Sequence, residues 1–309
     1  MTVGASVVIP TYNRRDVLRK CLMALFDQTY PSDCYEVVLV DDGSTDGTEE
    51  MVKSLRPTCE FIYLKQENKR QAAATRNLGI RRAAGKIVIF IDSDIISSRE
   101  LVAGHIEFHR RSENLIVQGP VIHTADLENP SSQRPRLRDI SRAFFCTSNV
   151  SVGRKHLLEA GLFDESFKES GWEDHELGFR LRKLGLRVKR AARCCIVYHY
   201  KEEFSLNSLP SVGSKAKRMG RNALLCYRKH PTLEVKLSTQ VGLFFFIFEK
   251  IVSCGNWWES KIGRRFISFL ERRDLSWLLQ ICMVVINNHY YVAGIKEALR
   301  LEREGGTSW

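Results

Sequence analysis

Two carboxylates stand one residue apart at the end of an apolar run. The run is VIFIDSDII, in which Asp92 and Asp94 flank Ser93. Carboxylates so close repel each other, and a polyphosphate nearby would add about 4 kcal/mol per charge pair at about 4 Å. Mg²⁺ or Mn²⁺ removes this repulsion, because these ions bind one or two carboxylates together with phosphate oxygens. The pair predicts a metal site for a nucleoside diphosphate derivative, and the alternative is that both aspartates only cap a turn.

A second acidic pair lies in FDESFKESGWEDHELGFRLRKLG, residues 163–185. On a helix that begins near Trp172, Asp174 shares a face with the apolar stripe of Leu177 and Leu181. We therefore expect Asp174 to point inward. The alternative for Asp174 and its neighbour Glu173 is that they complement the helix dipole in the first turn, which would lower their pKa. Trp172 either offers an apolar platform to a sugar or packs beneath its loop.

Three apolar runs that end in polar residues must position these groups. The runs are ASVVIP, YEVVLV and KIVIFI, followed by Thr11, by Asp41 with Asp42, and by Asp92. Runs of Val and Ile without alternation are typical of strands covered on both faces. The stretches 16–27, 47–55 and 71–84 predict intervening helices. This order predicts an α/β protein with a parallel sheet, whose ligand crevice lies beyond the carboxyl ends of the strands.

The segments VVIPTYNR, VVLVDDGSTDGT and ATRNLGIRRAAG, with the D-x-D, resemble family 2 glycosyltransferases of GT-A fold. The resemblance covers about residues 5–200. It implies a Rossmann-like, mostly parallel sheet with a helical C-terminal extension. It also implies an inverting, metal-dependent enzyme that moves a hexosyl unit from a UDP-linked donor to a hydroxyl of a glycan, lipid-linked or other acceptor. The alternatives are a nucleotidyltransferase that makes sugar nucleotides and a catalytically silent sugar-nucleotide-binding protein.

The same resemblance implies the donor site and its metal. The residues implied for the donor are Pro10, Thr11, Tyr12, Asn13, Arg14, Asp41, Asp42, Arg76, Asp92, Ser93 and Asp94. Asp92 and Asp94 would hold Mn²⁺ or Mg²⁺, and in related transferases a histidine at the position of His199 joins them. A carboxylate of the Asp41 pair can accept from a uracil N–H or ribose hydroxyls, and Arg76 can counter phosphate charge. The alternatives are turn-forming aspartates, a surface arginine and a structural histidine.

On the acceptor side, the resemblance extends to galactosyltransferases in which Gly-Trp precedes a Glu-Asp pair. It gives the role of catalytic base to Asp174, with Glu173 as second choice, because displacement at the anomeric carbon needs a proton acceptor opposite the diphosphate. The residues implied for acceptor binding are Gly171, Trp172, Ser148 and Asn149. We expect His175 to be a solvated helix residue.

The expected domains are a catalytic domain over 1–204, with a donor half over about 1–122 and an acceptor half over about 123–204, and a basic helical region over 205–309. The stretch 129–139, rich in Pro, Ser and Arg, predicts a loop that acts as a lid. Helices are expected over 213–229, 233–252 and 276–303.

The C-terminal region is basic, with 16 Lys and Arg against 8 Asp and Glu, so that it carries +8 of the net charge of +11. Such a surplus suits an anionic substrate or lipid, whereas no module that reads nucleic acid is recognisable. Neither LFFFIF nor WLLQICMVVI reaches the length of about 20 residues that a bilayer requires, so no spanning helix is expected. These stretches either form the core of helices or, with neighbouring aromatic and basic residues, attach the region peripherally to anionic lipid.

Several other classes of protein do not fit. No G-x-G-x-x-G follows the first strand and no phosphate-binding P-loop motif occurs, which excludes dinucleotide oxidoreductases and P-loop NTPases. The nine cysteines form no C-x-x-C pair and are odd in number, which is typical of a reducing compartment. No secretory segment precedes ASVVIP, so we expect a cytoplasmic protein. Peripheral attachment at the inner face of the membrane is the alternative that the basic C-terminal region leaves open.

Overall fold

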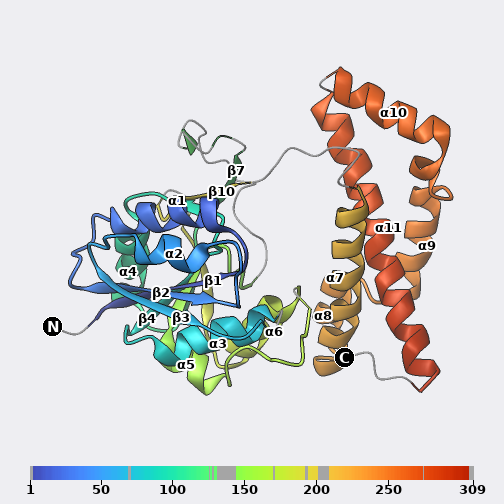
Figure 1. Ribbon diagram of the computed structural model, residues 1–309. Coiled ribbons are helices and arrows are strands. Elements are labelled where there is room, and N and C mark those ends of the chain that lie inside the picture. Colours follow the sequence, from blue (N-terminus) through green and yellow to red (C-terminus); the bar gives the residue numbers. More distant parts are fainter. Residues whose placement is uncertain are drawn as a thin grey trace. The chain divides into compact units, whose positions relative to one another are not determined.

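The computed structural model describes residues 3–68, 71–124, 126, 129–130, 144–169, 171–191, 194–200, 209–273 and 275–305. The chain divides into two compact units, one of residues 1–165 and 174–202, and one of residues 166–173 and 203–309. The first unit contains the strands and the second the long C-terminal helices (Figure 1). The predicted boundary at 204/205 and most of the predicted lid, 131–139, lie outside the described residues.

The first unit alternates strands and helices as its sequence predicts. Its strands are β1 (Ala5–Thr11), β2 (Tyr35–Asp41), β3 (Glu60–Lys65), β4 (Ile87–Phe90), β5 (Ile95–Ser97), β6 (Leu115–Gln118), β7 (Val121–Thr124), β8 (Val150–Gly153), β9 (Arg187–Arg190) and β10 (Val197–Tyr200). Its helices are α1 (Arg15–Phe26), α2 (Thr48–Lys53), α3 (Ala72–Arg82), α4 (Leu101–Arg111), α5 (Arg154–Glu159) and α6 (Glu173–Lys183), the last of which begins in the second unit.

Seven strands form the main sheet in the order β3-β2-β1-β4-β8-β6-β9. Neighbours pair in parallel except for β8, which runs antiparallel to both β4 and β6. Because β1 lies between β2 and β4, the polar residues that follow these three strands meet at one edge of the sheet. The predicted α/β class with a mostly parallel sheet is confirmed.

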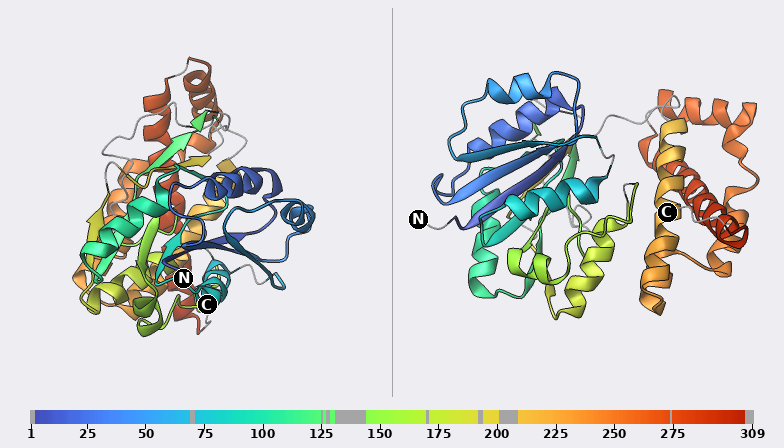
Figure 2. Two further views of the ribbon diagram at one scale, coloured as in Figure 1. Left: turned by 90° about the vertical axis from the view of Figure 1, so that its left-hand side faces the viewer. Right: turned by 60° about the horizontal axis from the view of Figure 1, so that its bottom comes forward.

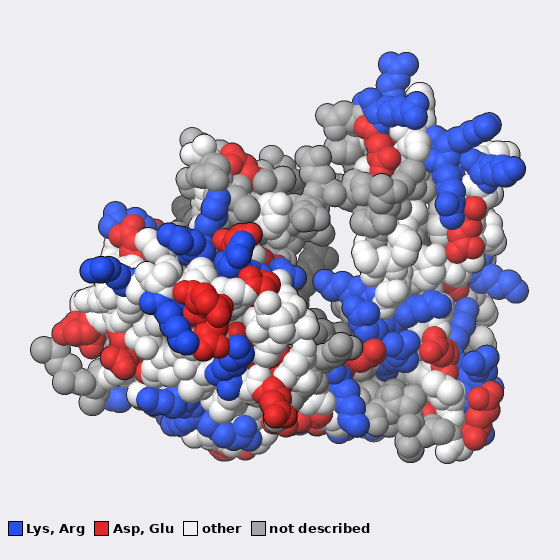
Figure 3. All heavy atoms as spheres, in the orientation of Figure 1, with Lys and Arg blue, Asp and Glu red and all other residues white. Residues whose placement is uncertain are grey.

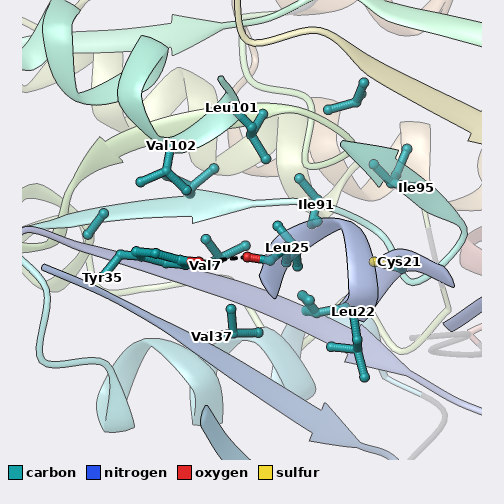
Figure 4. Packing of buried hydrophobic residues seen from close by; sticks show 14 of the residues in the cluster. Val7, Cys21, Leu22, Leu25, Tyr35, Val37, Ile91, Ile95, Leu101 and Val102 are labelled. Atoms are coloured by element: carbon teal, nitrogen blue, oxygen red, sulfur yellow. Dashed lines mark hydrogen bonds between the residues drawn. The ribbon is translucent and has the colours of Figure 1, made fainter. Parts of the chain in front are cut away.

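Helices cover both faces of this sheet (Figure 2). Successive strand residues point to opposite faces, so Val7 and Ile9 pack in one core with α1 and α4, whereas Val8 packs in another core with α3 and α6. Figure 4 shows the first core, in which the Tyr35 hydroxyl donates to the Leu25 carbonyl oxygen at 2.8 Å. Strands buried on both faces explain why the sequence shows unbroken apolar runs.

A small second sheet has the order β5-β10-β7. Strand β10 runs antiparallel to β5, with His199 opposite Ile95, and parallel to β7, with His199 opposite His123. Because Ile95 directly follows Asp94, this register brings His199 to the D-x-D segment. The Tyr200 amide N–H also donates to the Asp94 carbonyl oxygen at 3.0 Å.

The second unit is helical. It contains α7 (Leu209–Lys229), α8 (Leu233–Thr239), α9 (Leu243–Ser253), the 3₁₀ turn η4 (Trp257–Glu259), α10 (Lys261–Arg272) and α11 (Ser276–Arg303). The helix expected over 233–252 is two helices, because Gln240 adopts a left-handed conformation with φ of 57° and ends α8. Helix α10 was not expected. By length and composition Leu233–Glu259 and Trp277–Arg303 suffice to cross a membrane, which corrects the expectation that no segment does.

Helices α7 and α11 lie side by side in this unit (Figures 1 and 2). Their backbones approach closely at two glycines. A Cβ on Gly220 would lie 2.0 Å from the Tyr291 carbonyl oxygen, and one on Gly294 would lie 2.1 Å from the Lys217 carbonyl oxygen. The contact between the two helices therefore requires glycine at both positions. It buries Val292, Ile295 and Ala298 in the second half of α11.

Candidate active site

Asp94 is the acidic centre of one half of the site. Its Oδ2 lies 3.3 Å from His199 Nε2 and also accepts from the Arg14 guanidinium, on the loop after β1. The side chains of Asp94 and His199 are 12% and 25% exposed, so a ligand can reach them. Burial would raise the pKa of Asp94, but the hydrogen bond and charge of His199 and the charge of Arg14 outweigh it and hold that pKa below its usual range. Asp94 is therefore ionised at neutral pH.

Asp92 is bound by residues from two other elements. Arg76 Nη2, on α3, lies 3.1 Å from Asp92 Oδ1, and the Ser148 hydroxyl, just before β8, donates to Asp92 Oδ2 at 2.7 Å. The Arg76 guanidinium also lies over the Phe163 ring, 5.7 Å from its centroid. The structure thus brings together five predicted site residues at the carboxyl end of β4: Arg14, Arg76, Asp92, Asp94 and Ser148.

The donor set at this edge suits a divalent cation. Two neighbouring ligands of an octahedral ion with bonds of about 2.1 Å lie about 3.0 Å apart, close to the 3.3 Å between Asp94 Oδ2 and His199 Nε2. Within the described part of the chain, no group of three or more His, Cys, Asp or Glu side chains is placed to hold an ion. Asp92 instead faces Arg76 and Ser148. One or two carboxylates, supplemented by phosphate oxygens and waters, are the usual arrangement for Mg²⁺, and Asp94 offers one such carboxylate.

Arg76 connects Asp92 with Asp174. It forms the ion pair with Asp92, and its positive charge also acts on the Asp174 carboxylate. Cys146 also lies near both acids. Burial, together with the charges of Asp174 and Asp92, raises the pKa of its thiol to about 11. The acid predicted as the base and the first acid of the D-x-D therefore belong to one electrostatic cluster.

Asp174 is paired with the residue that follows it. Its Oδ1 accepts from the His175 amide N–H at 2.8 Å and lies 2.7 Å from His175 Nδ1. Burial would raise the pKa of Asp174, but the charge and hydrogen bond of His175, followed by the charge of Arg76, hold it below its usual value. His175 is partly buried, with 35% of its side chain exposed, which corrects the expectation of a solvated residue. Leu177 and Leu181 are fully buried, so Asp174 does stand above the buried stripe of α6.

Asp41 and Asp42 lie in a second polar group after β2. Asp41 is fully buried, and it accepts from the Ser44 amide at 2.8 Å and from the Tyr63 hydroxyl at 2.7 Å. Asp42 accepts from the Gln66 amide at 2.7 Å. These contacts hold both carboxylates at the edge of the sheet. The bond from the Ser44 amide to Asp41 also stabilises the turn after β2.

The loop after β1 is tied to the loop after β2. Asn13 adopts a left-handed conformation with φ of 48°. Its backbone N–H donates to the Ser44 hydroxyl at 2.9 Å, and its Oδ1 accepts from the Thr45 amide N–H at 2.8 Å. Tyr12 is 42% exposed beside them. The buried hydroxyl of Thr11 meets no hydrogen-bond partner among the described residues. An orphaned hydroxyl at this edge is consistent with a polar ligand that completes the site. Pro10, within β1, and the buried Ser93, between the two acids of the D-x-D, complete the predicted donor residues.

The segment before Asp174 belongs to the second unit, and α7 holds it. Asn222 Nδ2 donates to the Glu169 and Gly171 carbonyl oxygens at 2.8 and 2.9 Å, and Arg221 forms an ion pair with Glu169 at 2.9 Å. Gly171 has φ of 117°, which favours glycine. Glu173 is buried, and its Oε2 accepts from the Gly171 amide at 2.6 Å.

Two details bear on the predicted acceptor residues. Trp172 is 8% exposed and has φ of 75°, so it packs beneath the loop. Asn149 is 2% exposed, and its Nδ2 donates to the carbonyl oxygens of Pro120 and Cys195 at 3.0 and 2.7 Å. These contacts give Asn149 a structural role and do not support the acceptor role predicted for it. Glu173, which binds its own loop, is also the weaker of the two candidates for the base.

The family model for glycosyl transferase family 2 matches residues 6–165, which is more than half of the chain. The chain belongs to this family. It is therefore a glycosyltransferase, and the alternative of a nucleotidyltransferase is set aside. The matched residues include the loops of Asp41, Asp92 and Asp94. Asp174 and His199 lie beyond the matched range.

Curated relatives of this glycosyltransferase include "Uncharacterized glycosyltransferase YfnE" of Bacillus subtilis (strain 168), 29% identical over 266 residues in a match that covers 67% of each chain. Another is the chondroitin synthase of Escherichia coli, 27% identical over 285 residues in a match that covers 78% of this chain and 41% of the synthase. The glycosyltransferase thus spans less than half of the synthase.

Solved structures show the fold of the glycosyltransferase. The mannosyltransferase PcManGT from Pyrobaculum calidifontis, in complex with GDP-Man and Mn²⁺, has a TM-score of 0.66 at 17% identity, over 97% of this chain and 88% of that one. S. aureus TarS 1–349 in complex with UDP-GlcNAc has a TM-score of 0.55 at 17% identity, over 99% of this chain and 93% of that one. The fold is the GT-A fold.

Three parts of the site in the glycosyltransferase escape sequence reasoning. His175 binds Asp174, Tyr63 binds Asp41, and Asn222 binds the loop before Asp174. His175 stands beside an acid in the sequence, which is a signal for such a pair. Tyr63 and Asn222 are distant in sequence from their partners, and no local pattern marks them.

Proposed function

We propose that this glycosyltransferase is a metal-dependent, inverting enzyme that transfers a hexosyl unit from a UDP-linked donor to a hydroxyl group of a glycan or lipid-linked acceptor. The observation that carries the proposal is the placement of Arg76, which pairs with Asp92 and whose charge also acts on Asp174. The Arg76 guanidinium thus acts both on Asp92, the first acid of the D-x-D, and on Asp174, an acid able to accept a proton.

Asp94 and His199 would hold Mn²⁺ or Mg²⁺ with the diphosphate, and Asp92 would join them when Arg76 turns to a phosphate oxygen. When bound, the ion offsets the negative charge that develops on the departing diphosphate. The solved neighbours that contain Mn²⁺, PcManGT with GDP-Man and GalNAc-T7 with UDP and GalNAc, support this assignment.

The chain itself supplies charge and orientation for the donor. Arg14 and Arg76 are cations at the D-x-D, and both can move from the carboxylates to phosphate oxygens. Asp41 and Asp42 are held by Tyr63 and Gln66 at the carboxyl end of β2, where a carboxylate would accept from a base N–H or ribose hydroxyls. Ser148, whose hydroxyl donates to Asp92, would contribute to binding the acceptor beside the donor sugar.

Asp174 would remove the proton from the attacking hydroxyl. His175 and Arg76 keep its carboxylate ionised at neutral pH, as a proton acceptor must be. The alternative, in which Asp174 only complements the helix dipole, also predicts a lowered pKa. Here, however, the pKa is lowered by two side chains, His175 and Arg76. His175 Nδ1, 2.7 Å from Asp174 Oδ1, also fixes the orientation of the carboxylate.

A cytoplasmic location is part of the proposal. All nine cysteines are free, as is usual in a reducing compartment. Fractionation of cells that produce the full chain tests this location, and the enzyme is expected with the cytoplasmic proteins or at the inner face of the membrane.

The test of the reaction is release of UDP from a panel of UDP-sugars and GDP-sugars, each with Mn²⁺ and with a chelator. We expect release with one or more UDP-sugars, dependent on Mn²⁺, and a loss of at least about 100-fold in Asp94→Ala. Undiminished release in the presence of chelator would refute metal dependence. Tight UDP binding without turnover of any donor would instead favour the catalytically silent protein.

A further inference from the structure

The second unit exposes an unusual number of large apolar side chains. Of the eighteen such side chains exposed among the described residues, fourteen lie between residues 233 and 284. They are Leu233, Leu237, Leu243, Phe244, Ile247, Phe248, Ile251, Val252, Ile262, Phe266, Phe269, Trp277, Ile281 and Val284. Scattered apolar residues need no explanation, whereas a concentration of this kind marks a surface that contacts something apolar.

Helix α10 is apolar on two faces. Gly263, Ile267 and Leu270 are buried, and Ile267 packs with Trp258 of η4 and Ile286 of α11. On its other side, a stripe at spacings of four and three is open. It consists of Ile262, Phe266 and Phe269, which are 81%, 44% and 50% exposed. The protein core covers the buried stripe. The exposed stripe is expected to contact another apolar phase or surface.

Helices α9 and α11 expose stripes of the same kind. On α9 they are Phe244, Ile247, Phe248 and Ile251, all more than half exposed, and the rings of Phe244 and Phe248 stack at 6.4 Å. At the start of α11 the stripe is Trp277, Ile281 and Val284, at spacings of four and three. Both helices therefore share the feature seen in α10.

Positive charge accompanies this apolar surface. Along α10 stand Lys261, Arg264, Arg265 and Arg272 with one acid, Glu271, so the helix carries +3. Figure 3 shows Lys and Arg side chains projecting from the α10 end of the helical unit. Just after the helix, the Arg273 guanidinium lies 5.8 Å from the centroid of the exposed Phe269 ring.

The acidic residues nearby do not cancel this charge. Glu249 is buried and bound to His289 Nδ1 at 2.7 Å and to Lys296 Nζ at 3.1 Å. Glu259 accepts from the Tyr290 hydroxyl at 3.1 Å. A surface that is both apolar and cationic is complementary to an anionic phospholipid layer, whereas a second copy would bring like charges together.

The geometry favours attachment in the plane of the membrane over crossing it. The break at Gln240 leaves α9 with 11 residues, or about 16 Å, against a hydrocarbon core of about 30 Å. The second half of α11 is buried against α7 at Gly220 and Gly294, so a spanning α11 would have to leave α7. An in-plane α10 needs no such change.

We propose that α9, α10 and the first turns of α11 dock onto an anionic membrane surface, with α10 in the plane of the interface. In this arrangement Ile262, Phe266 and Phe269 enter the boundary between headgroups and acyl chains. Arg264 and Arg265 contact the lipid phosphates. The proposal concerns binding alone and does not depend on the proposed reaction.

The experiment is co-sedimentation of the full chain with phosphatidylcholine vesicles, with and without phosphatidylglycerol. We expect binding that requires phosphatidylglycerol and weakens at least about 10-fold in Arg264→Gln with Arg265→Gln and in Phe266→Ser with Phe269→Ser. The matched control is Leu158→Ser with Leu184→Ser, which changes exposed apolar residues of the first unit and should leave binding unchanged. All six replaced side chains are exposed, so each variant is expected to fold. Circular dichroism checks this expectation.

Three results would overturn the proposal. One is binding that ignores phosphatidylglycerol and is unaffected by either pair of α10 variants. A second is a dimer, seen by analytical ultracentrifugation without vesicles, that Phe266→Ser with Phe269→Ser dissociates, because the surface would then belong to a second copy. The third is protein that stays with the vesicles after extraction with sodium carbonate, since a spanning helix resists this treatment and an in-plane helix does not.

Discussion

His199 Nε2 lies 3.3 Å from Asp94 Oδ2, although 105 residues separate them in sequence. The register of β10 against β5 produces this proximity, because it sets His199 opposite the residue that follows Asp94. A histidine that merely ended a strand would not need an acid at this distance. This pair is the position at which the proposed Mn²⁺ or Mg²⁺ would be held.

Replacing His199 with Ala removes one predicted ligand and leaves Asp94 in place. We expect the Mn²⁺ concentration for half-maximal UDP release to rise about 10-fold, which corresponds to about 1.4 kcal/mol of lost binding. Activity at saturating Mn²⁺ should fall less. Titration of activity with Mn²⁺ measures both quantities, and an unchanged titration curve would assign His199 a structural role.

Asp174→Asn keeps the size of the side chain and removes its capacity to accept a proton. We expect donor binding to stay within about 2-fold of the wild type and transfer to fall at least about 100-fold, as general-base catalysis implies. UDP binding by calorimetry and transfer by product analysis separate the two effects. Glu173→Gln is the matched control, and a larger loss there would move the role of base to Glu173.

His175→Ala should move the acidic limb of the rate profile to higher pH. Asp174 must be ionised to act, so activity falls as pH drops through the pKa of Asp174. His175 lowers that pKa, and its removal raises it toward the usual value. The transfer rate at limiting donor, measured between about pH 4 and pH 8, reports the midpoint. A midpoint that stays in place, or moves to lower pH, would contradict the pairing.

Asn222→Ala tests the anchoring of the loop before Asp174. The substitution leaves the Glu169 and Gly171 carbonyl oxygens without their donor, and we expect the free energy of unfolding to fall by about 1–3 kcal/mol. Transfer should fall more than UDP binding. Urea denaturation and the same transfer assay measure these effects. Asn287→Ala, on an exposed position of α11, is the control and should change neither quantity.

Much of the sheet was predictable from sequence because β1, β2 and β4 are covered on both faces. Their sequences are therefore unbroken apolar runs. The D-x-D could be placed at the end of β4 for the same reason. Strands of three or four residues, such as β5 and β10, carry too little pattern, and their pairing decides whether they form. The position of His199 in the site depends on that pairing.

Other features depend on contacts that sequence patterns do not record. The break between α8 and α9 covers residues 240–242 and begins at the left-handed Gln240, inside an apolar stretch that otherwise fits one helix. Asn222 meets its partners 51 and 53 residues away. The role of Asn149 was misjudged because its short polar motif is the same whether the amide faces a ligand or, as here, buried carbonyl oxygens.

Two buried histidines should make the stability of the first unit depend on pH. His105 Nε2 lies 2.9 Å from Asn149 Oδ1, and the Ser151 hydroxyl lies 2.8 Å from both His105 Nδ1 and His109 Nε2. Burial lowers the pKa of each histidine to about 4, from 6.5 in the unfolded chain. The unfolded state therefore binds more protons between about pH 6.5 and pH 4.

Stability is consequently lost as pH falls through this window, by on the order of 3 kcal/mol for each histidine. Urea denaturation at a series of pH values between these limits measures the loss. His105→Gln with His109→Gln should flatten the dependence on pH, even if it lowers stability at pH 7. A slope as steep in the double variant as in the wild type would show that other groups carry the protons, because neither glutamine titrates.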